Sequence, residues 1–251
     1  MPDPLTILYQ DTEIVAVHKP AGLKMHRGAG DDRHQPFLLQ VVRDQTGRRI
    51  YPIHRLDQPT SGIVLLAFNT QTAHALAEKF KQQQVTKTYL AVVRGIIDPM
   101  GSIDYPLTPN AAEPKAGQTP KPAITDYERL ETIELPFATG QHATSRYSLA
   151  SVRPRTGRMH QIRRHFHHIS HPVIGDTIYG DGRHNRLFRQ QYDCHRLLLA
   201  AVALQLIHPW TGLPLCIEAP LEDSFWKAIC SLGWEVAIPG QWRADQGVGS
   251  M

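Results

Sequence analysis

The sequence lacks any apolar run long enough to cross a membrane. Its longest strongly apolar stretch extends only from Leu197 to Ile207, whereas a membrane-spanning helix needs about 20 such residues. The first ten residues, MPDPLTILYQ, contain neither the basic nor the apolar region of a secretory signal. These absences argue against a membrane or secreted protein, and we expect a cytoplasmic one.

A cysteine framework is also lacking. The 251 residues include only 3 Cys, Cys194, Cys216 and Cys230, and no two of them form a CxxC pair. An odd and widely spaced set of this kind indicates neither a disulfide framework nor a zinc site. A chain of this length buries roughly 70–75% of its unfolded surface, so its core can suffice without cross-links. We therefore expect reduced thiols.

Acidic side chains are missing from one long segment, although the net charge of the whole chain is only +4. No Asp or Glu occurs from Leu135 to Gly175, and all Lys or Arg side chains of that segment are arginines. Arginine binds phosphate oxygens through a planar fork, and carboxylates would repel phosphates at such a surface. The segment favours a polyanionic partner such as a nucleic acid, but an ordinary solvated basic surface has the same composition. Its cations and histidines are Arg146, Arg153, Arg155, Arg158, Arg163, Arg164, His142, His160, His165, His167, His168 and His171.

The apolar pattern predicts more strands than helices. Strands are predicted at 7–9, 14–17, 63–68, 88–94, 125–131, 144–153 and 197–207, and helices at 70–80, 158–169 and 225–232. Asn69 or Thr70 is expected to cap the first helix, and Asp223 or Ser224 the last. Because strands and helices do not alternate regularly, we expect an α+β fold: a mixed, mainly antiparallel sheet flanked by helices.

No boundary between separate domains is evident in the sequence. The proline-rich stretch 105–122 is typical of a long surface loop or insertion, but the chain on either side of it does not look complete alone. The tail at 241–251 is expected to be frayed. We predict a single catalytic domain over residues 1–251.

The segment HRLDQPTSG, residues 54–62, is the densest in reactive side chains. Turns use the same residue types, so a purely structural role is a serious alternative. A glycosidase would need a second carboxylate about 5–10 Å from Asp57, and an aspartyl-phosphate enzyme would need further carboxylates for magnesium. The basic segment supplies neither. His167 and His171 have the spacing of a metal-binding pair, but no carboxylate or cysteine accompanies them.

The HRLDxxTSG pattern at 54–62 resembles the signature of the RluA family of pseudouridine synthases. Further motifs of that family follow in the same order, and the resemblance extends from about Ile7 to Ala219. They are YQD at 9–11 with KPAG at 19–22, KTYLAVVRG at 87–95, RTGRMHQIR at 155–163, HPVIGD at 171–176 and YG at 179–180. The resemblance implies a pseudouridine synthase fold with a central RNA-binding cleft.

The resemblance also implies the roles of particular residues. Asp57 corresponds to the catalytic nucleophile, Tyr89 to the tyrosine that stacks on the target base and assists removal of the C5 proton, and Arg163 to the arginine that pairs with the aspartate. Arg55 corresponds to the residue that enters the space left by the flipped nucleotide, and Ile162 to an apolar residue of the base pocket. Further RNA contacts are expected from His54, Arg158, His160 and Arg164. The family uses neither a metal nor an organic cofactor.

These roles agree with the chemistry. Conversion of uridine to pseudouridine breaks an N-glycosidic bond and forms a C-glycosidic one, so the detached base must be retained while it rotates. Extruding a stacked base costs a few kcal/mol, and stacking on the ring of Tyr89 returns roughly 1–3 kcal/mol. An arginine within about 4–6 Å would lower the pKa of Asp57 and keep its carboxylate ionised.

The substrate is expected to be tRNA. Within the family, the segments 42–47, 55–62 and 163–165 resemble especially the branch that modifies uridine 65 in the T stem. The first motif begins within ten residues of Met1, so we expect no additional N-terminal RNA-binding domain, and specificity would come from segments 105–122 and 181–193. We expect a monomer without an obligate protein partner. A ribosomal RNA synthase, an RNA chaperone with incidental activity and a nucleotide phosphohydrolase remain alternatives.

Overall fold

The chain divides into two compact units. The computed structural model describes residues 3–28, 30, 35–109 and 119–244. The first unit comprises Met1–Lys87 and Ala201–Ala219, and the second comprises Thr88–Ala200 and Pro220–Met251. Strands β5 (Thr86–Arg94) and β9 (Leu199–Ile207) each contain residues of both units. The interpretation of the whole chain as a single catalytic domain stays a prediction.

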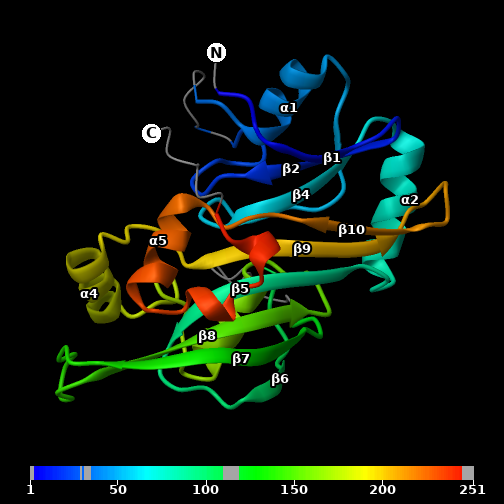
Figure 1. The fold of residues 1–251 in the computed structure, drawn as a ribbon. Coiled ribbons are helices and arrows are strands. Elements are labelled where there is room, and N and C mark those ends of the chain that lie inside the picture. Colours follow the sequence, from blue (N-terminus) through cyan, green and yellow to red (C-terminus); the bar gives the residue numbers. More distant parts are fainter. Residues whose placement is uncertain (1–2, 29, 31–34, 110–118, 245–251) are drawn as a thin grey trace. The chain divides into compact units, whose positions relative to one another are not determined.

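The first unit is built on a mainly antiparallel sheet (Figure 1). Its elements are β1 (Ile7–Gln10), β2 (Ile14–Lys19), α1 (Leu38–Thr46), β3 (Tyr51–Pro52), β4 (Ser61–Ala67), α2 (Thr70–Lys81), most of β9 and β10 (Pro214–Glu218). The strands follow the order β1-β2-β4-β9, while β3 pairs with β4 and β10 with β9. Every residue of β4 is buried, as its uninterrupted apolar run predicts. Asn69 caps α2, and its side chain accepts a hydrogen bond from the amide of Thr72 at 2.8 Å.

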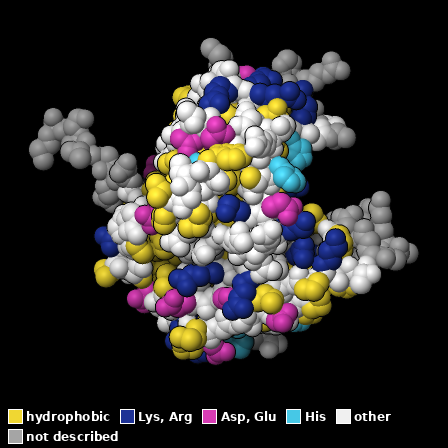
Figure 2. Space-filling model, turned by 90° about the vertical axis from the view of Figure 1, so that its right-hand side faces the viewer, with side chains coloured by type: hydrophobic (Ala, Val, Ile, Leu, Met, Phe, Trp, Pro, Cys, Tyr) yellow, Lys and Arg dark blue, Asp and Glu magenta, His cyan; other side chains and the backbone are white. Residues whose placement is uncertain are grey.

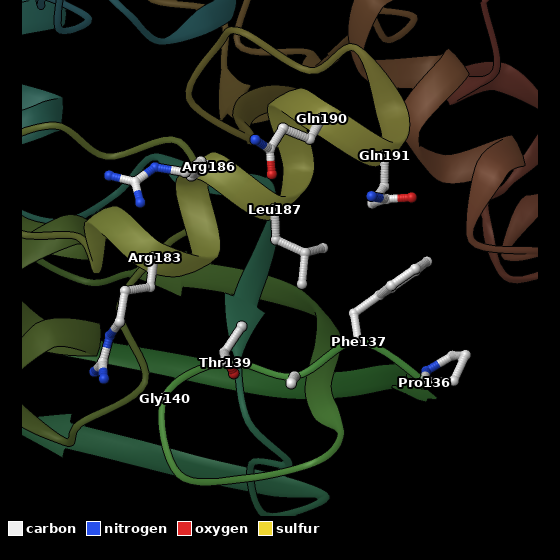
Figure 3. A pocket seen from close by; sticks show the side chains of 10 residues that line it. Pro136, Phe137, Thr139, Gly140, Arg183, Arg186, Leu187, Gln190 and Gln191 are labelled. Carbon is white, nitrogen blue, oxygen red and sulfur yellow. The ribbon is translucent and has the colours of Figure 1, made fainter.

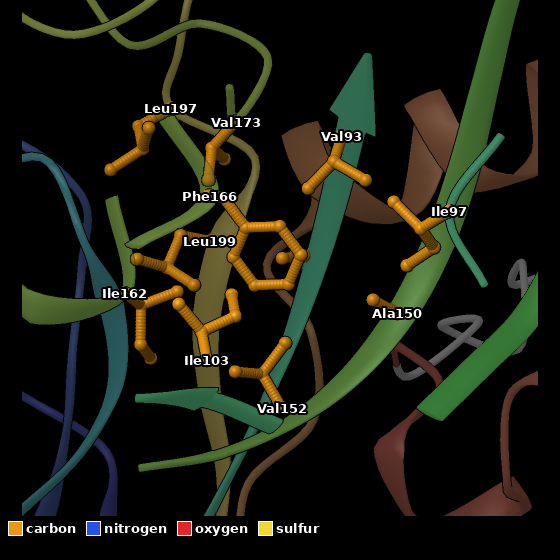
Figure 4. Close-up of a cluster of buried hydrophobic side chains, with 11 residues drawn as sticks. Val93, Ile97, Ile103, Ala150, Val152, Ile162, Phe166, Val173, Leu197 and Leu199 are labelled. Atoms are coloured by element: carbon orange, nitrogen blue, oxygen red, sulfur yellow. The ribbon is translucent and has the colours of Figure 1, made fainter. Parts of the chain in front are cut away.

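The second unit contains the other strands and helices. The strands are β5, β6 (Met100–Asp104), β7 (Ile124–Leu135) and β8 (Ser145–Pro154), in the antiparallel order β5-β8-β7-β6. The helices are α3 (Gln161–His168), α4 (Gly182–Tyr192) and α5 (Asp223–Ser231), followed by 3-10 turns at Glu235–Ala237 and Gly240–Trp242. Figure 4 shows the core of this unit, in which Phe166 of α3 lies among Ile103, Val152 and Leu199. The predicted α+β fold, mainly antiparallel and flanked by helices, is confirmed.

Two predicted boundaries were wrong for local reasons. The helix predicted over 158–169 begins only at Gln161, because His160 adopts the left-handed region with φ 54°. The side chain of Gln161 accepts a hydrogen bond from the amide of Arg158 at 3.0 Å. The cap of α5 is Glu222 rather than Asp223 or Ser224.

The end of the described chain is packed rather than frayed. The carbonyl of Trp242 accepts a hydrogen bond from the amide of Leu221 at 2.8 Å, and Ala244 is buried. The expectation of a frayed tail was therefore wrong for 241–244, and 245–251 lie outside the described residues. Across the ranges that the structure describes, no helix has the length and apolarity to cross a membrane.

The proline-rich insertion continues the β6–β7 hairpin at its base. Leu107 and Lys121 form a bridge with two backbone hydrogen bonds of 2.9 Å, and the side chain of Leu107 is buried. The ring of Tyr105 stacks on His168 of α3, with centroids 3.6 Å apart. The base of the insertion is thus attached to α3, while 110–118 lie outside the described residues.

Candidate active site

Asp57 lies half-buried on the loop between β3 and β4 in the first unit. The ammonium group of Lys19, whose side chain is 0% exposed, fixes the backbone of this loop. It donates hydrogen bonds to the carbonyls of Gln58 at 2.9 Å and Thr60 at 2.8 Å, and to that of Pro20 at 2.9 Å. Three acceptors match the three N–H donors of an ammonium. Lys19 is therefore a positioning residue that was not predicted from the sequence, and its place in the KPAG motif is the available signal.

The KPAG motif also holds the loop through its glycine. The amide of Gly22 donates to the carbonyl of Gln58 at 2.8 Å, and the side-chain amide of Gln58 donates back to the carbonyl of Gly22 at 3.1 Å. Gly22 has φ 89°, a conformation that favours glycine. Gln58, the residue after Asp57, is thus held in place by Gly22 of the KPAG motif.

Gly62 ends the HRLDxxTSG pattern for a steric reason. Its φ is 110°, and a Cβ atom there would lie 2.1 Å from the carbonyl oxygen of Ala201 on β9. Only glycine permits this approach between backbones. The motif therefore combines a loop that presents Asp57 with the start of the most deeply buried strand of the unit.

His54 supports the Asp57 loop from inside. Its Nε2 accepts a hydrogen bond from the amide of Leu65 at 3.0 Å, and its ring stacks on Phe80 with centroids 4.9 Å apart. Burial, together with the nearby charge of Lys87, lowers the pKa of His54 to about 4. The ring is therefore neutral at pH 7. An RNA contact through His54 stays a prediction, as does that of its exposed neighbour Arg55.

Two residues expected in the base pocket belong to one cluster in the second unit. Tyr89 on β5 lies opposite Val152 on β8, and its half-buried ring packs against the cluster that includes Ile162 and Phe166. Ile162 of α3 and Val152 both belong to this cluster (Figure 4). Tyr89 and Ile162 thus contact the same apolar core. Their contact with a uracil base stays a prediction.

Arg163 is held by an aspartate that the sequence reasoning left without a role. Its side chain, 2% exposed, forms a two-pronged ion pair with Asp176, with Nε to Oδ2 at 2.7 Å and Nη2 to Oδ1 at 2.8 Å. The amides of Ile178 and Tyr179 also donate to Asp176, at 2.9 and 3.0 Å. Burial raises the pKa of Asp176, but the bonds from Arg163 and the two amides outweigh it, and the pKa falls below its ordinary value. The predicted pairing of Arg163 with Asp57, which belongs to the first unit, stays a prediction.

Tyr179 connects Arg163 with the histidines of the basic segment. The guanidinium carbon of Arg163 lies 5.3 Å from the centre of the Tyr179 ring, a cation–π distance. The Tyr179 hydroxyl lies 3.0 Å from Nδ1 of His160, and its backbone carbonyl lies 2.7 Å from Nδ1 of His167. His160, an expected RNA contact, is thus part of a network around Arg163. The YG motif at 179–180 was the available signal for Tyr179.

Arg158, which precedes α3, and Arg164 on α3 both bind the base of the proline-rich insertion. Nε of Arg158 donates to the carbonyl of Pro122 at 3.2 Å. Nη1 and Nη2 of Arg164 donate to the backbone and side-chain oxygens of Thr108, at 2.9 and 3.2 Å. Both cations thus have structural partners, and their expected contacts with RNA stay predictions.

Although residues 135–175 include no Asp or Glu, carboxylates from β7 lie beside the arginines of this segment on the surface. On β7, Oδ2 of Asp126 lies 2.5 Å from Nε of Arg155. Oε2 of Glu134, also on β7, lies 3.1 Å from Nε of Arg146 on the neighbouring β8. On the face in Figure 2, exposed Lys and Arg side chains likewise lie among acidic and hydrophobic ones. The positive charge expected of this segment is thus partly neutralised by carboxylates of the preceding strand β7.

The histidine pair considered for metal binding has backbone partners. Nδ1 of His171 lies 2.7 Å from the carbonyl of Arg94, and Nδ1 of His167 bonds the carbonyl of Tyr179. Within the part of the chain that the structure describes, no group of three His, Cys, Asp or Glu side chains could hold a metal ion.

Comparison with known proteins places the site in a family. The family model described as RNA pseudouridylate synthase matches residues 13–168, which include Asp57, Tyr89 and Arg163. A protein of Pectobacterium carotovorum named tRNA pseudouridine synthase C is 44% identical over 240 residues, which are 94% of this chain and 64% of that protein. A protein of the same name from Vibrio cholerae is 43% identical over 242 residues, 93% of this chain and 98% of that protein.

A solved structure shows the same fold. Human RNA pseudouridylate synthase domain containing 1 superposes with a TM-score of 0.67 at 28% identity, over 88% of this chain and 86% of that chain. The protein therefore belongs to the RNA pseudouridylate synthase family, and the resemblance inferred from its motifs is confirmed. Asp176, Tyr179 and α4 lie beyond the residues that the family model matches.

Proposed function

We propose that this protein converts one uridine of tRNA into pseudouridine, and that the uridine is position 65 in the T stem. The strongest support is the similarity, over more than nine-tenths of this chain, to proteins named tRNA pseudouridine synthase C. The position within tRNA rests on the sequence motifs at 42–47, 55–62 and 163–165.

The proposed nucleophile is the carboxylate of Asp57. The three hydrogen bonds from Lys19 fix its loop, so the carboxylate meets the substrate without prior rearrangement of the backbone. The carboxylate forms a bond to the substrate that is broken again before the product leaves. The N1–C1′ bond of uridine breaks, the uracil rotates, and a C5–C1′ bond forms. The C5 proton then leaves and N1 gains one, so that the product is an isomer of the substrate.

Arg163 and Tyr89 are proposed to act with Asp57. The guanidinium of Arg163 would pair with the carboxylate of Asp57, and Asp176 would hold the guanidinium in the required orientation. Tyr89 would stack on the extruded uracil and assist departure of the C5 proton, with Ile162 beneath the base. Arg55, which is exposed on the Asp57 loop, would fill the space that the base leaves in the RNA helix.

The location, oligomeric state and cofactor requirement of the protein are also part of the proposal. We propose that the protein acts in the cytoplasm, as a monomer, and without a metal or organic cofactor. His54, Arg158, His160 and Arg164 would contribute to RNA binding through surfaces that their structural hydrogen bonds leave to solvent.

Chemical mapping of pseudouridine in tRNA and ribosomal RNA tests the proposal. RNA from cells with and without the gene is compared, and cells that carry Asp57→Asn provide the matched control. Loss of pseudouridine only at position 65 of tRNA is expected in the absence of the gene and in the variant. Loss in ribosomal RNA alone would show that the substrate was assigned wrongly, and an unchanged map would contradict the enzymatic function.

A further inference from the structure

A groove in the second unit is lined by none of the residues assigned to catalysis. It runs between the loop 136–144, which connects β7 and β8, and helix α4 (Figure 3). Arg183 and Arg186 line one end, and Phe137 and Gln191 line the other, with Leu187 between them. The groove thus has a cationic end and an aromatic end.

The loop wall of the groove is fixed by local hydrogen bonds. The hydroxyl of Ser145 donates to the carbonyl of Phe137 at 2.5 Å, and the amide of Thr139 donates to the carbonyl of His142 at 3.2 Å. Gly140 has φ 69°, a conformation that favours glycine, and it lies against the exposed end of the Arg183 side chain. The loop wall is therefore held by hydrogen bonds within residues 137–145.

Helix α4 is fixed by its buried polar face. The hydroxyl of Tyr147 lies 2.8 Å from Nδ1 of His184. The side chain of Asn185 accepts from the amide of Gly175 and donates to the carbonyl of Asp176, both at 2.8 Å. Because the carboxylate of Asp176 binds Arg163, the helix that lines the groove is joined to the segment that holds this arginine.

The cationic end retains excess positive charge. Asp181 accepts from Arg183 at 3.1 Å and from Arg94 at 2.9 Å, and the bonds from Arg183 lower its pKa to about 2. One ionised carboxylate thus pairs with two guanidiniums, and Arg186 lies one turn further along α4. The side chain of Arg183 is 63% exposed and Arg186 is exposed, so both are accessible to an anion. Guanidinium forks match phosphate oxygens.

The other end offers an aromatic face and amide groups. Phe137 is half-buried, and Gln190 and Gln191 are exposed beside it. Aromatic side chains stack on unpaired bases, and amides bond the exposed edges of such bases. A base within a duplex is already stacked and offers no face to Phe137.

We propose that this groove binds an unpaired nucleotide of the RNA substrate, with its phosphate at Arg183 and Arg186 and its base on Phe137. The inference rests on the proposed function, since it assumes an RNA substrate. Helix α4 and the loop 136–144 would then recognise a single-stranded segment of the RNA that does not include the reacting uridine.

Binding of short RNAs to the full chain tests this assignment. Phe137→Ala and Arg186→Ala are compared with Arg189→Ala, a matched control because Arg189 is exposed on α4 but does not line the groove. Fluorescence anisotropy measures the Kd for a labelled tetrauridylate and for a blunt RNA duplex. We expect both groove variants to weaken tetrauridylate binding by about fivefold or more, and Arg189→Ala to change it less than twofold.

The duplex separates base recognition from simple phosphate attraction. Phe137→Ala should leave duplex affinity unchanged, whereas Arg186→Ala should weaken it. Tetrauridylate affinity that is unchanged in Phe137→Ala, or equally reduced in Arg186→Ala and Arg189→Ala, would overturn the proposal. Ultraviolet crosslinking of tetrauridylate to wild-type protein, with peptide mapping, should place an adduct on the peptide that contains Phe137, and absence of that adduct would also overturn it.

An isomerase assay on tRNA distinguishes this inference from the proposed function. Phe137→Ala should raise KM and leave kcat unchanged, because Phe137 lies outside the residues assigned to the chemistry. If wild-type protein makes no pseudouridine, the proposed function is refuted. The crosslink to the peptide that contains Phe137 would still show whether the groove binds RNA. A variant with wild-type KM would overturn the groove assignment and leave the proposed function intact.

Discussion

Substitution of Lys19 by methionine tests how the Asp57 loop is held. Methionine keeps an unbranched chain of similar length and removes the ammonium group. The carbonyl of Gln58 retains the bond from Gly22, but those of Pro20 and Thr60 lose the donor at 2.9 and 2.8 Å. A buried acceptor left without its partner costs about 1–3 kcal/mol. Two carbonyls lose their donor, but methionine carries no charge that must be buried, and this offsets part of the cost. We therefore expect the free energy of unfolding to fall by about 2–4 kcal/mol.

The same substitution should affect catalysis more than RNA binding. A shift of about 1 Å in a reacting group can cost about a hundredfold in rate, so kcat should fall by about that factor while the Kd for tRNA changes little. Urea unfolding and single-turnover pseudouridine formation measure the two effects. Lys227→Met, at an exposed position of α5, is the control and should match wild type in both. A Lys19→Met protein with wild-type stability and wild-type kcat would refute the role assigned to the three hydrogen bonds.

Three further predictions follow from the site. Asp176→Asn should destabilise the protein by about 3–5 kcal/mol, because it leaves the buried charge of Arg163 without its anion, and urea unfolding that matches wild type would contradict the ion pair. The folded-state pKa of His54, about 4, lies below its unfolded value of 6.5, so the unfolded state binds more protons between these values and stability should fall as pH drops from 6.5 to 4. His54→Phe should lessen that fall in the urea midpoint, and an identical pH profile would show that another group is responsible. Dialysis against EDTA should leave pseudouridine formation unchanged, and an activity restored only by added metal would revive a metal-dependent reaction.

The parts of the fold determined by local sequence were predictable. The apolar run of β4 and the Asn69 cap of α2 depend on neighbours in the chain, and both predictions were confirmed. The start of α3 was not predictable in this way, because the left-handed conformation of His160 accompanies a hydrogen bond to Tyr179, nineteen positions away. Helix α4 escaped prediction because it buries the polar residues His184 and Asn185, whose partners lie in other elements.

The candidate site was predictable in its motifs but not in its supporting contacts. The resemblance identified Asp57, Tyr89 and Arg163 as candidates, whereas the roles of Lys19 and Asp176 depend on burial. A lysine is rarely buried completely, so composition gives no reason to expect Lys19 inside the unit. Likewise, the ion pair of Asp176 joins residues that sequence patterns do not connect.

Site-resolved detection of pseudouridine in tRNA treated with purified protein tests the central claim most directly. Wild-type protein should form pseudouridine at position 65, and Asp57→Asn should form none while its tRNA affinity stays within about threefold of wild type, since the carboxylate is assigned to the chemistry and not to holding the RNA. Turnover by Asp57→Asn at the wild-type rate would contradict the account.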